Sequence, residues 1–158
     1  MAQEEKELLF KDLSARLPYG VICQIYDHQQ DYGEDIFDAR LIHIDAWTSH
    51  CYFWGCSETD PYKIEQVKPY LRPMSSMTKK ETKELFKEIG FEFTCNTCGI
   101  PEHYIYEFAE QIKGIPTITN VEFIKVIDFL NAHHFDYRGL IEKGLAIEIN
   151  KSNNPYKE

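Results

Sequence analysis

The first half of the chain alternates apolar and polar residues as a half-buried β-strand does. The stretch "GVICQIY" at residues 20–26 shows this alternation, and "FDARLIHIDA" and "CYFWGC" follow with many β-branched and aromatic residues. Polar turns such as "DHQQDYGED" separate these runs. The pattern predicts an antiparallel meander. With "KIEQVKPYLRP" as a further short strand or turn, we expect a small SH3-like barrel over residues 17–73.

The second half changes to the spacing of amphipathic helices. In "MTKKETKELFKEIG", Thr78 and Glu81 fit a capping box, and Gly90 stands where a left-handed C-cap belongs. "IPEHYIYEFAEQIKG" predicts a second helix. "TNVEFIKVIDFLNAHH" begins with a possible box of Thr119 and Glu122 and is apolar on most sides, which predicts a core helix. "LAIEIN" predicts a last strand.

These patterns together predict an α+β protein in one compact unit. Residues 1–16 are expected to form an N-terminal helical segment, and 17–73 the barrel-like part. Residues 74–150 are expected to form a helical part packed on the barrel. The polar residues 151–158, which include Pro155, are expected to be a flexible tail.

Composition narrows the classes of partner. The chain has 158 residues, with 17 basic and 26 acidic side chains and a formal net charge of −9. This excess repels a phosphate backbone, so we expect no nucleic acid as partner. There is no long apolar run, so we expect no membrane contact, and five cysteines without a recognisable export signal indicate the cytoplasm.

The stretch "CNTCGIPEH" carries the most suggestive chemistry. Cys95 and Cys98 have the spacing of half a zinc site, and His103 is a candidate third ligand. Further candidates for completing the site are His50, Cys51 and Cys56. Because a structural site needs four ligands, the main expectation is no cofactor, with a zinc-stabilised module centred on Cys95 and Cys98 as an alternative.

The same cysteine pair resembles the active site of thioredoxins, since it precedes a predicted helix and "GIPT" follows. Sixteen residues separate Cys98 from Ile115, which leaves no room for the strand and helix of that family. Thr94 also stands where that family has an aromatic residue. Redox chemistry is therefore not favoured.

The stretch "NAHHFDYRG" offers a second possible active site. His133, His134 and Asp136 are residue types that serve as general bases or metal ligands, so an enzyme using the His133–Arg138 region is a further alternative. Helix ends also favour histidines and capping carboxylates for structural reasons. We therefore expect no catalytic residues.

Aromatic residues are concentrated near the third predicted strand. Trp47, Tyr52, Phe53 and Trp54 could line a peptide groove, as aromatic residues do in SH3 domains. Alternation sends Tyr52 and Trp54 to one face and Phe53 to the other, so part of this set should be exposed. Trp47 and Trp54 are therefore candidate partner-binding residues.

Three phrases, "LPYGV", "VKPYLRPMSSMT" and "NAHHFDYRGLIEKGLAIE", resemble uncharacterised small proteins of gut Bacteroidales and their phages or prophages. The resemblance implies a bacterial or phage-infected cytoplasm and an accessory role in a mobile element, without implying a reaction.

The leading hypothesis is a non-enzymatic accessory protein that binds a protein partner or a small ligand. Asp136, Tyr137 and Arg138 are the remaining candidate binding residues, because a guanidinium, a capping carboxylate and a phenol suit recognition. If Arg138 faces inward, we expect it instead to tie a backbone carbonyl or an acidic side chain between the two halves of the molecule.

Overall fold

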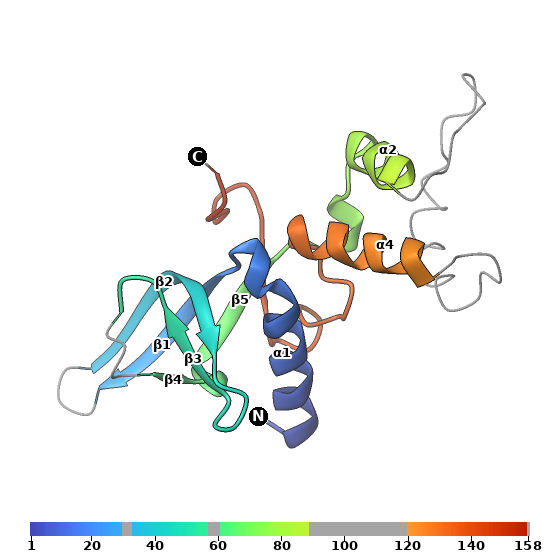
Figure 1. The fold of residues 1–158 in the computed structure, drawn as a ribbon. Helices are drawn as coiled ribbons and strands as arrows, with labels where there is room; N and C mark the ends of the chain where they lie inside the picture. Colours follow the sequence, from blue (N-terminus) through green and yellow to red (C-terminus); the bar gives the residue numbers. More distant parts are fainter. Residues whose placement is uncertain (30–32, 57–60, 89–119, 158) are drawn as a thin grey trace. The chain divides into compact units, whose positions relative to one another are not determined.

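The computed structural model describes residues 1–29, 33–56, 61–88 and 120–157. It divides into two units, Met1–Arg72 with Arg138–Glu158, and Pro73–Tyr137. Both helices and strands are present, which confirms the α+β class (Figure 1). No helix in the described ranges is long and apolar enough to cross a membrane.

The first unit contains one long helix and the sheet (Figure 1). Its elements are α1 (Gln3–Arg16), η1 (Leu17–Tyr19), β1 (Ile22–Gln29), β2 (Gly33–Ile44), β3 (His50–Phe53), β4 (Tyr62–Lys63), η2 (Ile64–Gln66), β5 (Val67–Leu71) and β6 (Ile147–Glu148).

The sheet has six strands in the order β4-β3-β2-β1-β5-β6. Neighbours pair antiparallel except β5 and β6, which are parallel. The antiparallel meander expected from the alternation is therefore present in β1, β2 and β3. The SH3-like barrel is not confirmed, because the sheet is open and ends in the short strands β4 and β6. The first part of β2, residues 33–40, pairs with β1, and its last part, residues 41–44, pairs with β3 with a register shift between Leu41 and His43.

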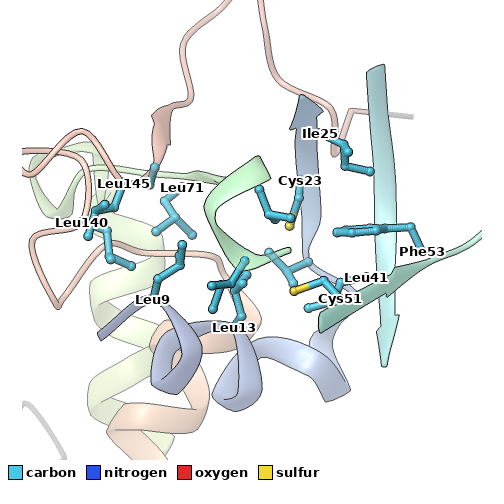
Figure 2. Packing of buried hydrophobic residues seen from close by; sticks show 14 residues of the cluster. Leu9, Leu13, Cys23, Ile25, Leu41, Cys51, Phe53, Leu71, Leu140 and Leu145 are labelled. Atoms are coloured by element: carbon cyan, nitrogen blue, oxygen red, sulfur yellow. The ribbon is translucent and has the colours of Figure 1, made fainter. Parts of the chain in front are cut away.

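The core of the first unit lies between α1 and one face of the sheet. Figure 2 shows Leu9 and Leu13 of α1 with Leu41 of β2 in a single apolar cluster, and all three are buried. Leu140 and Leu145 join the same cluster from the C-terminal segment (Figure 2). Residues from both ends of the chain therefore form the core of the first unit.

The second unit has its own core. Its elements are η3 (Met74–Ser76), α2 (Lys79–Glu88) and α4 (Asn120–Ala132). Among its described residues, the buried hydrophobic side chains are those of Met77, Leu85, Val126, Phe129, Leu130 and Phe135.

Helix α2 begins as its sequence predicts. The Thr78 amide donates to Glu81 Oε2 (2.8 Å), and the Glu81 amide donates to Thr78 Oγ1 (3.2 Å), which is the expected capping box. The expected C-cap at Gly90, the helix over 101–113 and Thr119 lie outside the described residues.

Helix α4 ends in a left-handed turn at His134 (φ 57°). The Phe135 amide donates to Leu130 O (2.9 Å) and the His134 amide to Asn131 O (3.1 Å), the bond pattern of a Schellman motif. Histidine occupies the position where glycine is usual.

Candidate functional site

The face of the sheet that points away from α1 carries a mixed polar and apolar surface. On β2, Ile36, Asp38 and Arg40 alternate with the more buried Phe37 and Ala39. The β1–β2 register places Gln24 across from Asp38 and Ile22 across from Arg40. We call this surface the outer face.

A directed chain of hydrogen bonds crosses the outer face. Tyr26 Oη donates to Gln24 Oε1 (2.7 Å), and Gln24 Nε2 donates to Tyr70 Oη (3.0 Å). Tyr70 Oη in turn donates to Asp38 Oδ1 (3.0 Å). Burial, followed by the hydrogen bond to the Asp38 carboxylate, raises the pKa of Tyr70 to about 12, so the phenol remains a donor at neutral pH. The chain thus fixes the orientation of an exposed carboxylate.

A hollow of about 570 Å³ opens beside this carboxylate. It is lined by Ile22, Asp38, Ala39, Arg40, Trp54 and Pro155. The Trp54 amide donates to Arg40 O (2.9 Å), which attaches the backbone of Trp54 to β2, yet the Trp54 side chain is 75% exposed. Part of the aromatic set was expected to be exposed, and Trp54 is one of its exposed members. We call this hollow the Trp54 hollow.

Arg40 forms one wall of the Trp54 hollow by lying over Gly20. A Cβ on Gly20 would come within 3.5 Å of Arg40 Nε, and the φ of Gly20 is +66°. This left-handed conformation is inexpensive for glycine and costly for most other residues. Gly20, the left-handed cap that ends η1, therefore packs beside the Arg40 side chain.

Tyr156 attaches the residues after β6 to the sheet. The β1–β5 register ends at Cys23 and Pro69, so its continuation places Ile22 across from Tyr70. Tyr156 Oη accepts from the Ile22 amide (3.0 Å) and donates to Tyr70 O (3.1 Å), taking the place of a direct bond between the strands. Burial raises the pKa of Tyr156 well above its usual value. This position brings Pro155 to the Trp54 hollow.

Arg138 contacts a buried ion pair. Arg16 donates to Asp12 from Nε (2.6 Å) and Nη2 (3.0 Å), one turn apart on α1, and both side chains are fully buried. Arg138 Nε lies 3.3 Å from Asp12 Oδ1, with 28% of its side chain exposed. Arg138 thus approaches an acidic side chain, as considered for an inward-facing Arg138, but Asp12 and Arg138 belong to the same unit of the chain.

The other two residues of the expected trio belong to the second unit. Asp136 is buried, and Tyr137 Oη donates to Asn131 Oδ1 (3.0 Å). His133 stacks on Phe129 with ring centroids 4.0 Å apart, and its Nδ1 lies 2.9 Å from Phe129 O. These contacts assign His133 and Tyr137 a part in the packing of the end of α4.

Trp47 lies in a tightly bonded loop between β2 and β3. Asp45 Oδ1 accepts from the Thr48 amide (2.7 Å), the Trp47 amide (2.9 Å) and Thr48 Oγ1 (2.9 Å). These bonds, led by that of the Thr48 amide, lower the pKa of Asp45. The loop holds Trp47 with 95% of its side chain exposed.

The proposed zinc ligands Cys95, Cys98 and His103 lie outside the described residues. Among the residues that are described, no group of three or more His, Cys, Asp or Glu side chains is arranged to hold a metal ion. Cys51 is buried, and burial raises its pKa to about 12, so this thiol is protonated at neutral pH.

Comparison with known proteins gives no family and no relative. No protein-family model matches the chain, and neither the curated proteins nor the solved structures contain a match.

Sequence reasoning missed Asp38, Tyr70 and Tyr156. Their contacts depend on strand register and on the path of the C-terminal segment, which composition does not reveal. The pairing of Asp12 with Arg16 could have been predicted from the sequence, since opposite charges four residues apart face each other on a helix.

Proposed function

We propose that this chain is a non-enzymatic accessory protein, of phage or mobile-element origin, that binds a protein partner on the outer face of its sheet. The observation that carries the proposal is Trp54. An indole that is 75% exposed, beside a hollow and attached through its backbone to β2, is a typical anchor for a partner. Ile36, also exposed on β2, adds apolar area to the same face.

The chemistry around Trp54 favours a basic segment of the partner. The face of an indole and an exposed carboxylate both attract a guanidinium or ammonium group, and Trp54 and Asp38 supply these two groups to one hollow. The net charge of −9 attracts a basic partner over longer distances. The guanidinium of Arg40 repels a cation of the partner. The partner's basic side chain is therefore expected beside Asp38, and this preference fixes the orientation of the bound segment.

Fixed geometry supports the proposal energetically. The hydrogen-bond chain orients Asp38 before any partner arrives, and Tyr156 holds Pro155 at the rim of the hollow. Side chains that are already ordered lose less conformational entropy on binding. The site therefore needs little rearrangement to accept an extended segment.

The test uses an array of hexapeptides with varied basic, acidic and apolar positions, probed with the purified chain. We expect a set of peptides with Lys or Arg beside apolar residues to bind, and Trp54→Ala and Asp38→Asn to abolish their signal. Trp47→Ala is the matched control, since it removes the other exposed indole. If no basic set binds, or if Trp47→Ala has the same effect as Trp54→Ala, the proposal fails.

A further inference from the structure

A second hollow, also about 570 Å³, lies between α1, the start of β3 and the β4–η2 segment. The residues that matter for its chemistry are Lys6, Phe10, Lys11, His50, Lys63 and Ile64. It shares no lining residue with the Trp54 hollow. Its volume falls within the range of small-molecule sites. We call it the α1 hollow.

The α1 hollow is rich in cations although the protein is acidic. Lys6 forms an ion pair with Glu65, which lowers the pKa of that carboxyl. Glu7, the other acidic lining residue, accepts a hydrogen bond from Gln3 Nε2 (3.2 Å). Lys11 and Lys63 form no ion pair within the described part of the chain, although the charge of Lys63 is a smaller cause of the lowered pKa of Glu65. Two ammonium groups and the His50 imidazole therefore remain available to an anion.

The same hollow offers apolar surface for the body of a ligand. Ile64 is buried at 2% exposure and Phe10 is half-buried, and both line it. Trp47 lies between two other lining residues, Ala46 and Thr48, in the loop that Asp45 fixes. Trp47 itself does not line the hollow, so the aromatic surface available to a planar group is that of Phe10.

We propose that the α1 hollow binds a small organic anion, with a phosphate or carboxylate group held by Lys11 and Lys63 and an aromatic body placed against Phe10. Lysine ammonium groups attract either oxyanion as point charges. The proposal is independent of the partner site on the outer face, because the two hollows have different linings.

The whole chain is titrated at low salt with adenosine 5′-monophosphate, with benzoate and with neutral adenosine. Binding is measured by calorimetry and by the NMR signals of the two indole N–H groups. We expect at least one anion to bind more tightly than adenosine and to shift the Trp47 signal. A response to the monophosphate alone identifies phosphate as the group recognised, and a response to benzoate alone identifies carboxylate.

Charge variants complete the test. Lys11→Met with Lys63→Met is expected to weaken binding of the anion about tenfold, whereas Lys83→Met, on α2 and outside the lining, is expected to change it less than about twofold. Both lysines of the site lie at the surface, and a circular-dichroism melt confirms that the double variant folds. The proposal is overturned if neither anion binds, if adenosine binds equally well, or if the double variant binds as the control does.

Discussion

At the scale of single residues, the most consequential group is the carboxylate of Asp12. Two guanidinium groups, those of Arg16 and Arg138, contact it, and Asp12 and Arg16 are fully buried. Removing one member of a buried charge pair is far more costly than removing a surface pair, because the remaining charge loses its compensation in a low-dielectric interior. Arg138 is therefore interpreted as a structural residue.

The first prediction compares the members of this cluster. Asp12→Ala is expected to lower the free energy of unfolding by about 3 to 5 kcal/mol, because it removes the carboxylate that both guanidiniums contact. Arg138→Met should cost less, about 1 to 3 kcal/mol, since Asp12 keeps its bidentate bond to Arg16 and Arg138 is partly exposed. Urea unfolding measures both values.

Lys80→Met, which removes an exposed ion pair with Glu84, is the matched control and should cost less than about 0.5 kcal/mol. If Arg138→Met leaves the urea midpoint unchanged but abolishes binding of the basic peptide, Arg138 is a recognition residue and the structural interpretation is wrong.

The second prediction concerns Asp45, whose pKa is lowered in the folded state by the Thr48 amide first and by His43 among the smaller causes. Because the folded pKa lies below the unfolded value of about 3.9, the stabilisation is fully present above that value and is lost as the pH falls through the folded pKa. The Thr48 amide signal should therefore move in NMR spectra as the pH falls from 5 toward about 2.

Asp45→Ala should give the acid-like Thr48 signal already at pH 6, because no carboxylate remains to accept the bond. A Thr48 signal that is the same in this variant and in the unaltered chain at pH 6 would contradict the assignment of the loop to Asp45.

At the scale of elements, the residues after β6 are attached to the sheet through the phenol of Tyr156. Tyr156→Phe removes the bridge between the Ile22 amide and Tyr70 O and should destabilise the chain by about 1 to 2 kcal/mol. It should also speed hydrogen exchange at Ile22. Tyr26→Phe is the control: it removes one hydroxyl whose bond is to a side chain on the outer face, and a smaller loss is expected. Equal losses for both variants would refute the bridging role.

Element type was largely predictable from the sequence, whereas the closure of the sheet was not. The alternation in "GVICQIY" and the capping box at Thr78 are local signals, and both correspond to the elements observed. Barrel closure depends on which strands pair at the two edges. Here β5 pairs with β1 on one side and with β6 on the other, and the latter comes from near the end of the chain. No local pattern carries that information.

The candidate site was predictable only in part for the same reason. Part of the aromatic set was expected to be exposed, but Trp54 lies just past the end of β3, and Asp38 and Tyr70 come together through pairings of β1 with two different strands. The polar segment before Glu158, expected to be a flexible tail, contains Pro155 at the Trp54 hollow and the hydrogen-bonded Tyr156. A single tyrosine in a polar tail gives little sign of such a contact.

At the scale of the whole molecule, the first unit offers two chemically different surfaces. The outer face combines Trp54 with a carboxylate and suits a basic protein segment, whereas the α1 hollow combines lysines with Phe10 and suits a small anion. The net charge of −9 attracts the basic protein segment over a long range and repels the small anion. Raising the salt concentration should therefore weaken peptide binding.

The two tryptophans of the chain give the most direct test of the central claim, that the outer face around Trp54 binds a partner. The measurement is an NMR titration of the ¹⁵N-labelled chain with the tightest basic peptide of the array, following both indole N–H signals. We predict that the Trp54 signal shifts in proportion to occupancy while the Trp47 signal stays in place. A peptide that shifts only the Trp47 signal, or neither signal at saturating concentration, would contradict the account.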